Sequence, residues 1–277
     1  MCIRDSSKPI LCRFCHLVVP QDSDRASDPD YTPDPSALLS GLTPHELADG
    51  ARTTNCHLCT RIVRLRDMPI HLAHHDLSRK TRPIPRPCRN VLCGRTLDGT
   101  TSTGETRANT KMGQGPGNEI GLCSTCFGPL YVALYDPEGR ALKRRVERRY
   151  LSQLLTGCGR KWCKNTFCKD GRLGTGVPVS EAAVATKDAI PMVKPLLDGL
   201  LGGIGGMHFC VDEANQKRRG LAEMLAAEGA GEHRRPGAKA YALEWCIGAL
   251  EAEAGRLDGA REWLANFAVA IGEGDGR

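Results

Sequence analysis

The sequence predicts a mainly α-helical protein that contains several small modules stabilised by zinc. Three observations predict this class. Cysteines occur in closely spaced groups, an amphipathic helical pattern runs directly into one of these groups, and two further helical periods fill the C-terminus. Aromatic residues make up only 5% of the 277 residues, so metal ions are expected to replace part of the hydrophobic packing.

The first residues are expected to be a gene-model artefact. Residues 1–7 open with Met-Cys-Ile-Arg-Asp-Ser, which resembles a translated sequencing-adapter remnant. We therefore assign no role to Cys2 and expect the first cysteine-rich region to span residues 8–130.

Residues 8–130 contain four closely spaced cysteine pairs, which are expected to form zinc knuckles of irregular or β structure. A short loop can place two thiolates on one ion, so the pairs predict two zinc sites of four cysteines each. The expected ligands are Cys12, Cys15, Cys56, Cys59, Cys88, Cys93, Cys123 and Cys126. Sequential pairing would give two sites like those of zinc ribbons, whereas alternate pairing would give a cross-brace of the RING type. The spacing leaves both open.

The second pair allows another grouping. Cys56 and Cys59 with His71 and His75 have a spacing one residue short of the common finger built on two cysteines and two histidines. Alternatively, the histidines of this segment are polar residues of a short helix.

Residues 139–213 are expected to form a further zinc-binding module. Apolar residues recur every four positions from Leu142 to Leu154 and predict an amphipathic helix that ends at Gly157. Three cysteines with C-x4-C-x4-C spacing follow: Cys158, Cys163 and Cys168. Soft thiolates gathered in so short a segment suit one tetrahedral zinc ion.

This stretch resembles the AZUL domain, an amino-terminal zinc-binding domain of a HECT-type ubiquitin ligase. The resemblance rests on Gly157-Cys-Gly, on the Asn165-x-Phe-Cys168 ending and on the Tyr-containing helix in front. It implies a helix-loop-helix held by one zinc ion on four cysteines, the fourth of which follows the second helix. Cys210 stands at that position, with His208 as the alternative, although the interval after Cys168 is longer than the family's usual one. The family docks a helical segment of a proteasomal ubiquitin receptor, so the resemblance implies such a partner.

The C-terminal residues 216–272 are expected to form a three-helix bundle. A first helix is predicted over residues 217–227 with Leu221, Met224 and Leu225 inward, and two further helical periods meet at Gly255.

These C-terminal periods resemble the UBA domain, which commonly binds ubiquitin. The UBA-like candidate contacts to ubiquitin are Met224, Leu225, Gly229 and Leu264. The sequence departs from the usual Met-Gly-Phe/Tyr loop, because a longer polar loop follows the first helix.

We expect an adaptor of the ubiquitin-proteasome system that carries about three structural zinc ions and binds ubiquitin, a proteasomal ubiquitin receptor helix, or both. One alternative is an E3 ubiquitin ligase or ligase subunit that uses the N-terminal zinc modules, which a cross-brace would favour. Another is a nucleic-acid-binding zinc finger protein, since the net charge is +6 and residues 140–149 are strongly basic. Few aromatic residues are available to stack bases, so an acidic protein helix is the expected ligand of that basic surface.

The motifs do not predict catalysis by this chain. It contains no P-loop, no nucleophile elbow and no H-E-x-x-H, and the catalytic lobe of a HECT ligase needs several hundred further residues. If the protein belongs to an enzyme complex, we expect it to be a component of a ubiquitin-protein ligase.

The longest apolar stretch is broken by Asp198, and the start lacks an apolar leader, so we expect the protein in the cytoplasm or nucleus and expect no membrane contact.

Overall fold

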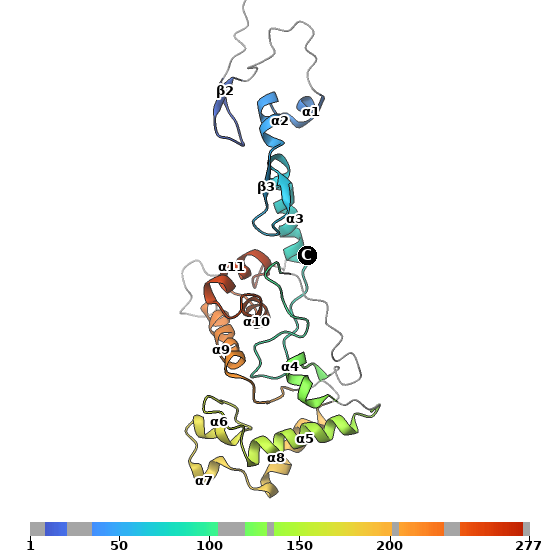
Figure 1. The fold of residues 1–277 in the computed structure, drawn as a ribbon, viewed down its shortest axis with the longest axis vertical. Coiled ribbons are helices and arrows are strands. Elements are labelled where there is room, and N and C mark those ends of the chain that lie inside the picture. Colours follow the sequence, from blue (N-terminus) through green and yellow to red (C-terminus); the bar gives the residue numbers. More distant parts are fainter. Residues whose placement is uncertain are drawn as a thin grey trace, which may run out of the picture. The chain divides into compact units, whose positions relative to one another are not determined.

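The computed structural model describes residues 9–20, 35–104, 120–131, 136–200, 205–229 and 239–273 (Figure 1). Within these ranges the protein is mainly α-helical with a few short strands, as the sequence predicts. It divides into two compact units, residues 1–81 and residues 82–277, which we describe one at a time. The predicted artefact at residues 1–7, which includes Cys2, lies outside the described ranges. The boundary after Thr81 falls inside the cysteine-rich region with two zinc sites that we expected over residues 8–130.

The first unit repeats one local order, a two-stranded hairpin followed by a helix. Its elements are β1 (Pro9–Leu11), β2 (Val18–Pro20), α1 (Pro35–Ser40), α2 (Pro44–Gly50), β3 (Thr53–Asn55), β4 (Ile62–Arg64), the 3-10 turn η1 (Leu65–Asp67) and α3 (Met68–Thr81). Both hairpins are antiparallel, with Ile10 opposite Val19 in the first and Thr54 opposite Val63 in the second. Each hairpin carries one of the cysteine pairs between its strands.

The second unit is built from helices. They are α4 (Ser124–Phe127), the 3-10 turn η3 (Gly128–Leu130), α5 (Arg140–Leu155), α6 (Lys169–Gly174), α7 (Val179–Ala182), α8 (Thr186–Asp198), α9 (Glu213–Glu228), α10 (Leu243–Ala252) and α11 (Leu257–Phe267). The predicted apolar stripe of α5 is confirmed, because Leu142, Val146, Tyr150 and Leu154 are all buried. None of the described helices combines the length with the apolarity that a bilayer crossing demands.

Helix α5 has a defined start and delivers Cys158 at its end. The Asp136 carboxylate accepts hydrogen bonds from three consecutive backbone N–H groups of its first turn, at 2.9–3.1 Å. A carboxylate there also compensates the positive end of the helix dipole. The helix ends at Leu155, close to the predicted end, and Gly157 adopts a left-handed φ of 87° that favours glycine. The chain then turns sharply into the cysteine loop.

Helix α8 packs on α5 (Figure 1) and contains two prolines, a residue that usually interrupts a helix. The helix continues through both Pro191 and Pro195. Both prolines are exposed, whereas Ala189, Val193 and Leu197 are buried on the other face. The hydrogen bonds that proline cannot donate therefore lie on the solvent side, and apolar packing holds the buried side in helical form.

The C-terminal helices form the expected three-helix arrangement, in which α10 packs against both α9 and α11 (Figure 1). Every residue from Trp245 to Leu250 is buried. One expectation is wrong, because Met224 points outward with 57% of its surface exposed. Ala222 and Leu225 are buried on α9 instead, so the inward face of this helix is rotated relative to the predicted one.

This bundle is joined to residues 82–104 of the same unit. The Glu251 carboxylate accepts hydrogen bonds from the backbone N–H of Thr96 at 2.9 Å and from its hydroxyl at 2.5 Å. The indole N–H of Trp263 donates to the carbonyl oxygen of Thr101 at 3.0 Å. At Gly248, a Cβ atom would lie 3.2 Å from the Thr100 side chain, so the two segments approach closely. We expected this bundle to be a separate module, and the sequence carries no local signal for these contacts.

Candidate metal centres

The first candidate centre gathers Cys158, Cys163, Cys168 and Cys210, whose sulfur atoms all lie within 4.8 Å of one another. Cys158 follows α5, Cys168 precedes α6, and Cys210 arrives just before α9. The Sγ atoms of Cys163 and Cys210 are 3.7 Å apart. Four thiolates around tetrahedral zinc at 2.3 Å would be about 3.8 Å apart, so the spacing fits one such ion.

Helix α5 positions the segment that carries Cys210. The Gln153 side chain accepts a hydrogen bond from the Cys210 N–H at 2.9 Å and donates to the carbonyl oxygen of His208 at 3.0 Å. The Tyr150 hydroxyl accepts from the His208 N–H at 2.9 Å, and burial raises the pKa of this phenol. The His208 ring packs on Phe167, with centroids 4.6 Å apart. Of the two candidates for the fourth position, the structure therefore brings Cys210 to the three thiols, and His208 lies outside the group.

The second candidate centre consists of Cys88, Cys93, Cys123 and Cys126, all of which are buried. The Sγ atoms of Cys93 and Cys123 are 3.7 Å apart, which again matches a tetrahedral edge of about 3.8 Å. This grouping agrees with sequential pairing of the third and fourth cysteine pairs. A cross-brace of the RING type is not formed by the residues that the structure describes.

Two turns with the same sequence pattern support these two centres. The patterns are Cys88-Arg-Asn-Val-Leu-Cys93 and Cys163-Lys-Asn-Thr-Phe-Cys168. In each turn the carbonyl oxygen of the asparagine accepts a hydrogen bond from the N–H of the second cysteine, at 2.9 Å for Asn90 and 3.0 Å for Asn165. This C-x-N-x-x-C repeat is the signal in the sequence that could have linked the two centres.

Buried asparagine side chains donate to cysteine sulfurs at both centres. Asn90 donates to Cys126 at 3.4 Å, and Asn165 donates to Cys210 at 3.3 Å. A third asparagine, Asn215 of α9, donates to the sulfur of Cys93 at 3.5 Å. Such outer contacts orient metal ligands and stabilise negative charge on sulfur. These residues were not among the expected site residues, because asparagine is usually exposed.

The positively charged Arg149 side chain contacts the backbone of both four-cysteine groups. Its guanidinium donates to the carbonyl oxygens of Cys126 at 3.1 Å and Cys210 at 3.4 Å. It also lies over the Phe209 ring, with Cζ 4.2 Å from the centroid. Burial lowers the pKa of this group, although an arginine keeps its proton in proteins. A zinc ion on four thiolates carries a net negative charge, so a fixed cation between two such sites is favourable.

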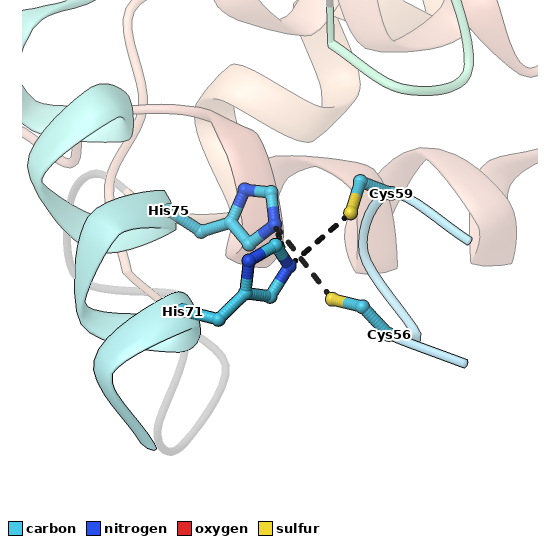
Figure 2. A group of neighbouring side chains, drawn as sticks. All are labelled: Cys56, Cys59, His71 and His75. Atoms are coloured by element: carbon cyan, nitrogen blue, oxygen red, sulfur yellow. Dashed lines mark hydrogen bonds between the residues drawn. The ribbon is translucent and has the colours of Figure 1, made fainter. Parts of the chain in front are cut away.

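The third candidate centre joins Cys56 and Cys59 of the second hairpin to His71 and His75 of α3, as Figure 2 shows. The Cys59 Sγ lies 3.3 Å from Nε2 of His71, and the Cys56 Sγ lies 3.7 Å from Nε2 of His75. The two Nε2 atoms are 3.0 Å apart. Burial lowers the pKa of His75, which favours the neutral imidazole that a metal ion needs.

Two four-cysteine sites were the preferred expectation for residues 8–130, and the structure forms one of them, the second candidate centre, but does not bring the first two cysteine pairs together. Cys56 and Cys59 face the nearby histidines, because α3 follows their hairpin directly and presents residues four apart on one face. His74 is exposed and outside the group. Cys12 and Cys15 lie with His45 and Asp49 instead, two residues that the sequence patterns did not single out.

The comparisons with known proteins agree with the first centre. Residues 143–195 match the AZUL family, which is described as the amino-terminal zinc-binding domain of a ubiquitin ligase. The matched segment begins in α5, contains the three cysteines of the C-x4-C-x4-C loop and ends in α8. No curated protein and no solved structure matches the chain. Because residues 143–195 match a zinc-binding family and the donor sets suit zinc, the protein is a zinc-binding protein.

The residues expected to contact ubiquitin are mostly inaccessible. Met224 is exposed, but Leu225 and Leu264 are only 5% and 2% exposed, and Gly229 is also buried.

Among the described cysteines, Cys246 stands outside all four groups. Burial raises the pKa of its thiol to about 12, so it is protonated at neutral pH and does not suit a thioester relay.

Proposed function

We propose that this protein is a zinc-stabilised adaptor of the ubiquitin-proteasome system whose AZUL domain docks a helical segment of a partner. The observation that carries the proposal is the coincidence of the family match at residues 143–195 with the α5–α8 helix pair and its cysteine loop. The family's description ties the domain to a ubiquitin ligase. By resemblance, the partner is a helix of a proteasomal ubiquitin receptor.

The outward face of α5 supplies positive charge for such a partner. Arg144 and Arg148 are exposed, stand one helical turn apart and make no ion pair among the described residues. Neighbouring basic residues are already paired, since Arg140 contacts Glu138 and Lys143 contacts Asp198. Two exposed guanidinium groups on one helix face favour a partner with acidic side chains.

Helix α8 contributes apolar surface. Ile190 and Met192 are 52% and 38% exposed, and they lie on two different sides of the face that is buried against α5, because residues two apart do not share a helix face. An amphipathic helix that packs along one side of α8 would bury one of these side chains against its own apolar residues, and acidic residues of such a partner would pair with the α5 arginines. Basic side chains together with exposed apolar side chains favour a helical protein segment as the partner. Nucleic acid stays an alternative partner.

Binding of the zinc-loaded full chain to labelled peptides tests this proposal. The peptides should span the acidic helical segments of proteasomal ubiquitin receptors, with binding measured by fluorescence anisotropy. We expect the double variant Arg144→Glu/Arg148→Glu to weaken binding by roughly tenfold or more. Arg256→Glu is the matched control, because Arg256 is paired with Glu253 in the C-terminal bundle. Equal affinities for wild type and double variant, or equal losses in both variants, would refute the docking surface.

Ubiquitin binding by the C-terminal bundle is a second candidate. A hollow of about 490 Å³ lies beside α9, and its lining includes Trp162, Leu221 and Met224. Exposed Met and Trp side chains are typical of protein-binding surfaces. The same anisotropy experiment with labelled ubiquitin tests it, and Met224→Asp should abolish binding if this surface is used. The UBA resemblance rests on the C-terminal helical periods, which include Leu257-x-x-Ala-x-x-Trp-Leu264, and the three-helix arrangement is consistent with it.

A further inference from the structure

We propose that Cys12, Cys15, His45 and Asp49 form a fourth zinc site, which uses two thiolates, one imidazole and one carboxylate. Their donor atoms all lie within 4.8 Å of one another. The Cys15 Sγ is 3.3 Å from Nε2 of His45, and both the Cys12 Sγ and this Nε2 are 3.7 Å from Oδ2 of Asp49. Tetrahedral zinc with sulfur, nitrogen and oxygen ligands has donor–donor distances of about 3.3–3.8 Å. The four atoms therefore surround a space of the right size.

The hairpin that carries Cys12 and Cys15 has the same backbone geometry as the hairpin of the third centre. The N–H of His16 donates to the carbonyl oxygen of Cys12 at 3.0 Å, and the N–H of Thr60 donates to that of Cys56 at 2.8 Å. His16 and Thr60 each follow the second cysteine of their pair, and both adopt left-handed φ values, 57° and 58°. Left-handed conformations are unfavourable for residues other than glycine, so the same unfavourable turn occurs twice.

The helix that carries the other two donors is also equivalent. His45 and Asp49 are four residues apart on α2, as His71 and His75 are on α3, so each helix presents both donors on one face.

The start of α2 is fixed by a capping box. The Thr43 hydroxyl accepts from the N–H of Glu46, and the Glu46 carboxylate accepts from the N–H of Thr43. The same carboxylate accepts from the N–H of Arg13 at 3.3 Å, which ties α2 to the cysteine turn. The donors are therefore held in place by both elements.

Asp49 replaces the second histidine of the finger pattern and changes the charge of the site. Two thiolates and a carboxylate leave a zinc complex with one negative charge, whereas the third centre is neutral. Arg52 lies 3.3 Å from the other carboxylate oxygen of Asp49 and compensates this charge. A carboxylate is a harder ligand than imidazole, so we expect this site to release zinc to a chelator before the third centre does.

Native mass spectrometry of the zinc-loaded full chain tests the proposal by counting ions. We expect four zinc ions in the wild type, one for each donor group, and three in Cys15→Ser. Asp49→Ala should lose the fourth ion at a chelator concentration that the wild type withstands. Asp49→His should restore or improve retention. Asp67→Ala is the matched control, since this exposed carboxylate lies outside the group. A wild type that holds three ions would overturn the proposal.

Alkylation of the wild type provides a readout that needs no variant. With the full chain loaded with zinc, peptide mapping should show Cys12 and Cys15 protected from iodoacetamide, and a chelator should make both reactive. Rapid modification of this pair while the cysteines of the other three centres stay protected would contradict a fourth zinc site.

Discussion

The side-chain amide of Asn90 donates a hydrogen bond to the carbonyl oxygen of Phe209, 3.1 Å away, and its Oδ1 accepts from the N–H of the same residue at 3.2 Å. This pair of bonds joins the turn between Cys88 and Cys93 to the segment that delivers Cys210. On the other side, Asn165 donates to the carbonyl oxygen of His208 at 2.8 Å. The two four-cysteine centres are therefore built on one shared segment, and each stabilises the position of the other.

Asn90→Ala tests this connection. The substitution leaves the buried N–H and carbonyl groups of Phe209 without their partners, which costs about 1–3 kcal/mol per unsatisfied group. We expect a lower free energy of unfolding in urea with the zinc content unchanged, because Asn90 supplies no ligand. Asn55→Ala, at an exposed position, is the control and should leave the unfolding midpoint where it is. An unchanged midpoint for Asn90→Ala would show that the shared segment is held by other contacts.

Cys163→Ser tests the AZUL centre. Metal binding supplies much of the folding free energy of so small a module, so this variant should lose one zinc ion and part of its helical circular dichroism. Cys246→Ala is the matched control, since Cys246 is buried but belongs to no donor group. The assignment fails if Cys163→Ser keeps both its full zinc content and its helicity.

Leu264→Ala tests the C-terminal core. Leu264 is buried in the three-helix bundle, and removing a core leucine costs roughly 2–5 kcal/mol. Met224→Ala should change the free energy of unfolding by less than about 0.5 kcal/mol, because that side chain is exposed. Similar losses in the two variants would mean that the assigned faces of these helices are incorrect.

Glu251→Ala tests whether the bundle depends on residues 82–104. It leaves the buried N–H and hydroxyl of Thr96 without an acceptor, so we expect a loss of about 1–3 kcal/mol in the free energy of unfolding. Glu244→Ala, on the same helix, is the comparison. If the two variants are equally stable, the contact between the segments contributes nothing measurable.

Much of the AZUL region could be predicted from the sequence, because its signals are local. The apolar stripe from Leu142 to Leu154 has helical periodicity, and three cysteines follow within a few residues. The assignment of Cys210 as the fourth ligand rested on the family resemblance. The outward orientation of Met224 was missed, since α9 has apolar residues at several adjacent positions and the choice of face depends on how α10 packs.

The remaining metal groups depend on contacts that local patterns do not encode. His45 and Asp49 lie far from Cys12 in the sequence. A histidine and an aspartate on a short helix look like ordinary surface residues. The buried asparagines were missed for a similar reason, although the repeated C-x-N-x-x-C pattern was present. The two turns that contain it have the same backbone hydrogen bond, which shows what the repeat encodes.

The most direct test of the account is a nitrogen-15 NMR titration of the zinc-loaded full chain, first with the helical peptide of a proteasomal ubiquitin receptor and then with ubiquitin. We expect the peptide to shift amide signals on the outward faces of α5 and α8, including those of Arg144, Arg148 and Ile190. A folded, zinc-loaded protein whose α5 and α8 signals do not move at saturating peptide concentration would contradict it.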